Sequence, residues 1–141
     1  MLKLSKLADY AVVIISCLEN HTGELVSASI LAQDTRLPEP TVAKVLKLLA
    51  AADIVKSTRG VKGGYSLSRN VADISIKDVI VALDGPIALT ACVEDSGEGC
   101  DFAPTCAMHG RWNRVNTAIK TALENVSIAN MIEQQNLKKR A

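Results

Sequence analysis

The sequence predicts a mainly α-helical chain with a small β-hairpin, organised as a winged helix-turn-helix domain followed by a long C-terminal dimerisation helix. Three observations support this fold class. Two short helical patterns are separated by a three-residue turn, a glycine-rich hairpin pattern follows them, and a helix with coiled-coil spacing lies near the end of the chain. We expect a winged domain over residues 1–85, a loop over 86–109, and a helix with a tail over 110–141.

The length and composition indicate one domain with an extension. The chain has 141 residues, of which 48% are apolar and 3% aromatic, and typical domains span about 100 to 150 residues. No apolar stretch approaches the roughly 20 residues that cross a bilayer, so we expect a soluble, cytoplasmic protein with no membrane partner. Lys3 and Lys6 precede the apolar run 11–18 as in a secretory signal, but Asp9 and Tyr10 interrupt that pattern.

The formal net charge of +1 hides two regions of opposite sign. Residues 36–70 hold seven basic and two acidic side chains, whereas residues 92–106 hold four acidic side chains and no basic one. A basic region favours a phosphate-bearing partner, and an acidic region does not. The two regions are therefore expected to serve different purposes.

Apolar residues recur at three-and-four spacing over residues 4–18, which predicts an amphipathic first helix. Cys17 lies within this pattern and is expected to be a small core residue, because cysteine is among the most often buried residue types. His21 follows beside a turn signal and is expected in a solvated loop. Ser27 is a suitable N-cap for a second, short helix that ends at about Asp34.

A third helix is predicted from Pro38 to about Ala52, because proline is tolerated in the first turn of a helix. Its apolar stripe at helical spacing consists of Val42, Val45, Leu46 and Leu49. Its outward face, polar at the start and basic further on, carries Thr41, Lys44 and Lys47. A short helix, a tight turn and a second helix with such a face form the helix-turn-helix pattern, in which the second helix enters the major groove of DNA.

Two strands are predicted over residues 54–59 and 64–68, around the glycine-rich turn 60–63. This hairpin is interpreted as a wing, and Arg59 and Lys62 lie at its tip. A basic hairpin tip can reach the DNA backbone or the minor groove beside the groove that holds the helix. The alternative is a solvated basic hairpin without a nucleic-acid partner.

Ser75 and Asp78 form a capping-box pattern that begins a further helix, which Gly85 and Pro86 end. A last long helix is predicted from about residue 108 to 125. Its apolar residues follow the spacing of a coiled-coil seam, which favours packing on a second copy of the chain; the alternative is packing within one chain. The seam consists of Trp112, Val115, Ile119, Ala122 and Val126. A short terminal helix over 127–135 and a basic tail over 138–140 complete the chain.

Three of the four cysteines and one of the two histidines lie close together in the acidic loop. Their spacing is Cys-x7-Cys-x5-Cys-x2-His, formed by Cys92, Cys100, Cys106 and His109. In a reducing cytosol such clusters are more often metal ligands than disulfides. Three thiolates and an imidazole suit zinc or an iron–sulfur cluster, and spacing alone does not choose between them. The acidic neighbours are expected to raise the thiol pKa values, which argues against peroxide-sensing thiols.

Three segments resemble the Rrf2 family of bacterial winged-helix regulators, in particular its iron–sulfur members of the IscR type and the regulators of Suf cluster-assembly operons. These segments are residues 1–11 (MLKLSKLADYA), the wing 59–65 (RGVKGGY), and the loop cysteines with His109 and Trp112. The resemblance spans residues 1 to about 132. It implies a homodimer that binds a palindromic operator on double-stranded DNA, most simply as a repressor of iron–sulfur cluster assembly genes. It also implies that Cys92, Cys100, Cys106 and His109 hold a [2Fe-2S] cluster whose occupancy changes operator binding.

The chain also departs from this resemblance. The first cysteine spacing looks longer than in IscR-type relatives, and some family members complete a [4Fe-4S] cluster with an acidic residue of the partner subunit, at a place where this chain has Asp9. Ala43 stands where some relatives carry an acidic residue that discriminates between DNA motifs. Two rival functions are a zinc-stabilised DNA-binding regulator and, in another class, a redox enzyme or cluster scaffold. We expect no enzyme, because the chain has no Cys-x-x-Cys and no phosphate-cradling loop.

Overall fold

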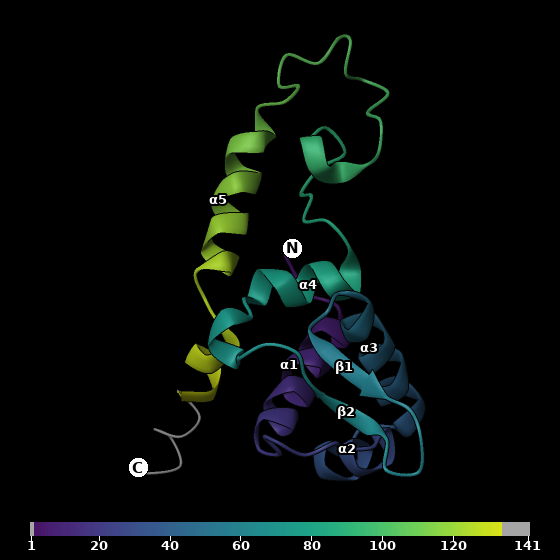
Figure 1. Ribbon diagram of the computed structural model, residues 1–141. Coiled ribbons are helices and arrows are strands. Elements are labelled where there is room, and N and C mark those ends of the chain that lie inside the picture. The colour runs from purple at the N-terminus through teal and green to yellow at the C-terminus, as the bar shows by residue number, and fades with distance from the viewer. Residues whose placement is uncertain (1, 134–141) are drawn as a thin grey trace.

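The computed structural model describes residues 2–133 and consists of a helical body with a projecting arm (Figure 1). The body contains α1 (Lys6–Glu19), α2 (Ala28–Thr35), α3 (Glu39–Ala51), the hairpin β1 (Val55–Thr58) and β2 (Gly64–Leu67), and α4 (Ile76–Asp84). The arm contains a long loop and α5 (Trp112–Glu124). The predicted fold class, mainly helical with one hairpin, is confirmed.

The body is held together by one apolar core to which all its helices contribute. The predicted stripes of α1 and α3 supply much of this core, although Leu4 at the start of the first stripe is exposed. The largest fully buried side chains are Ile14, Ile15, Leu31, Leu46, Leu49, Ile54, Ile74 and Ile128. Burial of such side chains stabilises the fold by roughly 1.5 to 3 kcal/mol each. Because α1, α2, α3 and α4 all pack on this core, the position of α3 is fixed from several sides.

Serine caps set the starts of three helices, at the predicted places for α2 and α4, whereas α1 begins at Lys6 rather than at the predicted Leu4. The hydroxyls of Ser5, Ser27 and Ser75 accept hydrogen bonds from the backbone amides of Ala8, Ile30 and Asp78. Ser75 and Asp78 form the complete capping box, since the Asp78 carboxylate also accepts from the Ser75 amide at 3.1 Å. Each such cap is worth about 1 kcal/mol. Between α2 and α3, Arg36 takes a left-handed conformation with φ of 59°, which turns the chain sharply into α3.

The wing is tied to the body by backbone hydrogen bonds as well as by side chains. β1 and β2 pair antiparallel with Val55 opposite Leu67, and Val26 joins the other edge of β2 through two bonds to Tyr65, of 2.9 and 2.7 Å. A Cβ atom on Gly64 would lie 2.9 Å from the Val26 backbone, and one on Gly63 would lie 2.2 Å from the Thr58 carbonyl oxygen. Both glycines are therefore required by close backbone approach.

The prediction for the last long helix is wrong at its start. α5 begins at Trp112, not at residue 108, and residues 107–111 form turns. Gly110 has φ of 73°, which lies in the left-handed region and ends any helix there. After α5 a short helix runs over 128–133 with Ser127 at its N-terminus, where the Ser127 hydroxyl accepts from the Asn130 amide. The predicted end of this helix at 135 and the basic tail 138–140 lie outside the described residues.

The far end of α5 returns to the body beside α4. The Ile76 amide donates to the Val126 carbonyl and the Ile128 amide donates to the Ile74 carbonyl, both at 2.9 Å. Ile128 is fully buried in the core, and Lys77 forms an ion pair with Glu124 at 3.1 Å. The arm is therefore anchored to the body at its C-terminal end, while the loop at its other end points away (Figure 1).

Among the helices of residues 2–133, none combines the length and apolar composition needed to cross a membrane.

Candidate nucleic-acid interface and cysteine loop

α3 presents a polar and basic surface on the side opposite the core. Its four predicted inward residues are all fully buried, which fixes the rotation of the helix about its axis. Lys44 and Lys47 are consequently exposed, and Thr41 is half-buried near the N-terminal end. Ala43 is exposed on the same side. This surface holds hydrogen-bonding and cationic groups of the kind that contact base edges and phosphates.

The tip of the wing adds two further cations. Arg59 and Lys62 are exposed, and Val61 between them is fully exposed as well. Within the described chain neither cation has an ion-pair partner. The tip and the outward face of α3 are thus two separate basic surfaces on the body. In a winged helix, the helix enters the major groove and the wing tip reaches the backbone or the minor groove beside it.

The cysteine loop lacks the packing that holds the body. Between residues 86 and 111 only Val93 is buried, and regular structure is limited to a single 3-10 turn at Glu94–Ser96. Local turns shape the rest: the Ala103 amide donates to the Cys100 carbonyl and the His109 amide to the Cys106 carbonyl. Cys92 and Cys100 are half-buried, whereas Cys106 and His109 are exposed.

Cys92 lies where the two ends of the loop meet. Its sulfur lies 3.2 Å from the Thr90 hydroxyl, and the backbone of Gly110, at the opposite end of the loop, also bonds to it. These hydrogen bonds, from Thr90 first and then Gly110, lower the pKa of the Cys92 thiol because they stabilise the thiolate. The expectation that the thiol pKa is raised is therefore wrong for Cys92, where the hydrogen bonds outweigh the opposing effect of burial.

The four predicted metal ligands are not gathered into one set. Over residues 2–133, the one set of three or more His, Cys, Asp or Glu ligand atoms within 4.8 Å of one another is Cys17, His21 and Asp34, outside the loop. Cys92, Cys100, Cys106 and His109 share one loop whose ends meet at Cys92 and Gly110, and no three of their donor atoms lie within 4.8 Å of one another, as a site for a single metal ion requires. Asp9 lies exposed in the first turn of α1, in the body.

A polar stripe on α5 holds the first part of the loop, and the sequence reasoning missed it. Asn116 is only 3% exposed; its side-chain amide donates to the Ile87 carbonyl at 2.9 Å and accepts from the Leu89 amide at 3.0 Å. Asn113 accepts from the Glu94 amide at 3.1 Å, and Lys120 pairs with Asp95. The spacing of 113, 116 and 120 on one side of a helix was the available signal.

The predicted apolar seam of α5 is left largely uncovered within one chain. Trp112 is 43% exposed and Val115 44%, Ala122 is exposed as well, and Ile119 is half-buried. The prediction for Val126 is wrong, because α5 ends at Glu124 and Val126, 40% exposed, lies in the segment that follows the helix. The polar stripe occupies the adjacent side of the helix. α5 thus has one side bound to the loop and an apolar side without a partner among the described residues.

A buried core that orients one helix, a hairpin tied beside it and basic groups on both define a winged-helix DNA-binding protein. The chain matches the Rrf2 family, described as "Iron-dependent Transcriptional regulator", over residues 4–134. It therefore belongs to the Rrf2 family of transcriptional regulators, as the resemblance implied.

Two groups of curated relatives are also named as HTH-type transcriptional regulators. An HTH-type transcriptional regulator of Mycobacterium tuberculosis is 31% identical over 134 residues, which cover 92% of this chain and 81% of that protein. The regulator IscR of Yersinia enterocolitica is 31% identical over 84 residues, or 60% of this chain. That match spans only half the length of IscR. These relatives are transcriptional regulators rather than enzymes.

Solved structures agree over almost the whole chain. CymR, titled the global cysteine regulator of B. subtilis, superposes with a TM-score of 0.71 and 29% identity, over 95% of this chain and 98% of its own. The IscR of T. potens superposes with a TM-score of 0.67 and 30% identity, over 95% of this chain and 88% of its own. The arm is thus part of the shared fold and not only the winged body.

Proposed function

We propose that the chain is a homodimeric transcriptional regulator, acting in the cytoplasm on iron–sulfur cluster assembly genes, whose affinity for a palindromic operator changes with occupancy of a [2Fe-2S] cluster. The observation that carries the proposal is the position of the cysteine loop. It lies between the winged body and α5, and α5 contacts both the loop and the body.

The donor set suits such a cluster chemically. Thiolates hold iron–sulfur clusters and histidine replaces cysteine in some of them. Hydrogen bonds already favour the thiolate of Cys92, and Cys106 and His109 are linked by a one-turn hydrogen bond and open to solvent. A bound cluster would supply iron–thiolate and iron–imidazole bonds within the loop. Cluster binding would hold these four side chains in one arrangement, and the loop, in which only Val93 is buried, would change shape to reach it.

Such a movement has a route to the DNA-binding surface. Residues 87–95 are held to α5 by Asn113, Asn116 and Lys120, and the end of α5 is bonded to α4. α4 packs on α3. If α5 pairs with a second copy through its apolar seam, a change in the loop alters the distance between the two α3 helices. The cluster then acts as a ligand that favours one of two arrangements.

DNA binding is tested by gel shift and by the dependence of affinity on salt. With about 6 to 10 phosphate contacts per dimer, affinity should fall by roughly 10³ to 10⁵ between 50 and 200 mM salt. Lys44→Ala and Arg59→Ala should weaken binding, and Arg114→Ala, which removes an exposed cation from α5, serves as the matched control. Equal effects of all three substitutions would contradict the proposed surface.

Cluster binding is tested on anaerobically purified protein by its iron and acid-labile sulfide content and its visible spectrum. Cys92→Ala, Cys100→Ala and Cys106→Ala should each abolish the absorption and change operator affinity, whereas Cys17→Ser should keep both. Mössbauer spectra of His109→Ala and Asp9→Ala separate a [2Fe-2S] cluster on His109 from a [4Fe-4S] cluster completed by Asp9 of a second copy. Colourless protein that contains zinc would favour the structural-zinc alternative.

The similarity to CymR supports a second candidate, a regulator of cysteine metabolism that needs no cluster. The three loop thiols and the imidazole favour the first candidate. Protein that lacks iron and sulfide after anaerobic purification, but binds DNA upstream of genes for cysteine metabolism, would decide for the second. Cluster transfer to an acceptor protein without any DNA binding would instead favour a scaffold.

A further inference from the structure

The set formed by Cys17, His21 and Asp34 lies in the winged body, away from the loop. Cys17 is in the last turn of α1, His21 follows that helix, and Asp34 is in the last turn of α2. His21 lies in a turn, as predicted, but its side chain is half-buried, and Asp34 and Glu24 approach its ring from two sides. We propose that Cys17, His21 and Asp34 form a binding site for a divalent transition-metal ion of the zinc type.

The distances between the donor atoms suit a tetrahedral ion. The Asp34 carboxylate oxygen lies 3.1 Å from Nε2 of His21 and 3.9 Å from the Cys17 sulfur, and all three donor atoms lie within 4.8 Å of one another. Bonds of about 2.0 to 2.3 Å to a tetrahedral zinc ion place neighbouring donors roughly 3.4 to 3.6 Å apart. The two distances to Asp34 lie within a few tenths of an ångström of this range, and the third pair, Cys17 and His21, lies within 4.8 Å.

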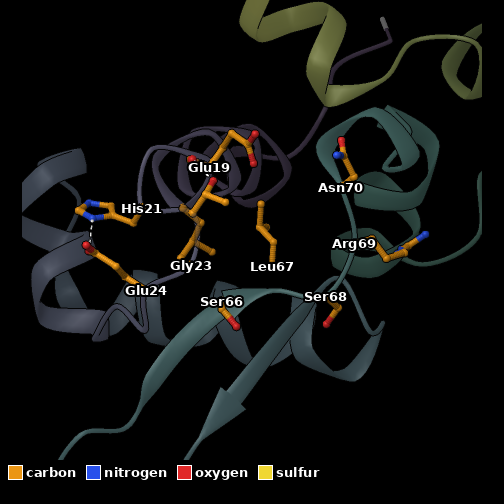
Figure 2. A pocket seen from close by; sticks show the side chains of 11 residues that line it. Glu19, His21, Gly23, Glu24, Ser66, Leu67, Ser68, Arg69 and Asn70 are labelled. Atoms are coloured by element: carbon orange, nitrogen blue, oxygen red, sulfur yellow. Dashed lines mark hydrogen bonds and ion pairs between the residues drawn. The ribbon is translucent and has the colours of Figure 1, made fainter.

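The histidine is oriented by a second carboxylate. Figure 2 shows the His21 ring joined to Glu24, with Nδ1 at 3.6 Å from the Glu24 carboxylate oxygen. This leaves Nε2 directed at Asp34. A carboxylate on the far ring nitrogen is the usual partner of a metal-binding histidine, because it fixes the ring and strengthens the donor nitrogen.

The local field favours a cation. α1 and α2 both end at this site, and helix C-termini carry partial negative charge. Neither helix has a basic residue in its last turn that could neutralise it. A surface depression beside the donors, bordered by Ser16, Asn20 and Thr35, leaves room for water as the fourth ligand. Sulfur, nitrogen and a single carboxylate select zinc-type ions over magnesium or calcium, which prefer oxygen ligands.

Binding should be linked to pH. Burial first, and then the Asp34 charge and hydrogen bond, raise the pKa of the Cys17 thiol. The thiol must therefore lose its proton to the solvent when the metal–sulfur bond forms, so metal affinity should rise with pH. The bound ion would join α1 to α2 immediately before the Arg36 turn into α3.

The test uses the full chain with Cys92, Cys100 and Cys106 replaced by serine, which leaves Cys17 as its only thiol. Titration of this protein with Co²⁺ should give a cobalt–thiolate charge-transfer band that saturates at one ion per chain and disappears when Zn²⁺ is added. Zn²⁺ at about 100 times its Kd should also raise the Tm by on the order of 5 °C or more. Because the loop thiols are gone, the result is independent of the cluster proposal.

Matched variants in the same background locate the ion. Cys17→Ser should remove the band, His21→Ala and Asp34→Asn should each weaken Co²⁺ binding more than about 100-fold, and Glu24→Gln should weaken it by about 10- to 100-fold. Circular dichroism verifies that each variant is folded. Absence of the band in the folded Cys17-only protein, or its persistence unchanged in both His21→Ala and Asp34→Asn, would overturn the proposal.

Discussion

The winged body and the arm are built by different means. In the body, apolar stripes from four helices meet in one core, and caps and glycines fix the ends and turns. In the loop of the arm, Val93 is the one buried side chain between residues 86 and 111, and hydrogen bonds from α5 hold the backbone. The body thus has a geometry set by its own packing, whereas the loop can change shape at little cost. A regulator of the kind we propose uses a rigid body to bind DNA and a loop whose shape depends on its ligand.

The largest expected difference concerns core truncation. Leu49→Ala removes a fully buried side chain of α3 and should lower the free energy of unfolding by about 2 to 5 kcal/mol. Phe102→Ala removes a side chain of the loop that is 74% exposed, so the change should stay within about 0.5 kcal/mol. Urea unfolding of the metal-free protein measures both. Comparable losses would mean that the loop is packed as firmly as the body.

Two glycines offer a finer comparison. Gly64→Ala would place a Cβ atom 2.9 Å from the Val26 backbone and should destabilise the protein by roughly 1 to 3 kcal/mol. Gly99→Ala in the loop meets nothing within 4 Å and should be nearly neutral. Thermal unfolding of the two variants, together with operator affinity for Gly64→Ala, tests this. A stable Gly64→Ala protein with normal DNA binding would show that the wing has more freedom than we infer.

Asn116 tests the connection between α5 and the loop. Asn116→Ala leaves the Leu89 amide and the Ile87 carbonyl without their partner. Since both residues are half-buried and water can reach them, we expect a loss near the lower limit for an unsatisfied group, about 1 kcal/mol. Thr117→Ala, on an exposed side of α5, is the control. Hydrogen exchange should quicken at residues 87–95 in Asn116→Ala alone, and unchanged protection there would refute the connection.

The smallest effect is on thiol reactivity. The pKa of Cys92 is lowered by hydrogen bonds and that of Cys17 is raised by burial and by Asp34, so the Cys92 thiolate should form at lower pH. Proteins with only one of these two cysteines, the others being serine, would be alkylated with iodoacetamide over a pH series without metal. The midpoint for Cys92 should lie below that for Cys17. The reverse order would contradict the hydrogen bonding seen at the loop ends.

Periodicity was sufficient to predict the body and insufficient for the arm. The stripes at Val42, Val45, Leu46 and Leu49 and the capping box at Ser75 lie as predicted, because burial and capping act over a few residues. The start of α5 was missed because Gly110 adopts a left-handed conformation that helical spacing does not reveal. Residues 113, 116 and 120 were missed because their partners, backbone groups for Asn113 and Asn116 and the Asp95 carboxylate for Lys120, lie in the loop about 20 to 30 residues away in sequence.

The candidate sites divide in the same way. Thr41, Lys44 and Lys47 could be proposed from sequence because they lie on a helix whose faces follow from spacing. Arg59 and Lys62 could be proposed because they lie at the glycine-rich turn between two predicted strands. The set of Cys17, His21 and Asp34 could not, because it depends on how the ends of two helices meet. Because Cys17 lies within the apolar pattern of α1, it was predicted as a core residue, and its polar neighbours come from segments that this pattern does not include. For the loop, the sequence proposes which side chains hold a metal or cluster but not where they lie.

The two backbone hydrogen bonds between Val26 and Tyr65 fix the hairpin on the body in a way that sequence change at its tip does not disturb. Neither bond involves a side chain, so the angle of the hairpin is inherited independently of what its tip carries. If the tip contacts the operator, as we propose, exchange of Arg59, Val61 or Lys62 would alter operator preference while the hairpin keeps its place on the body.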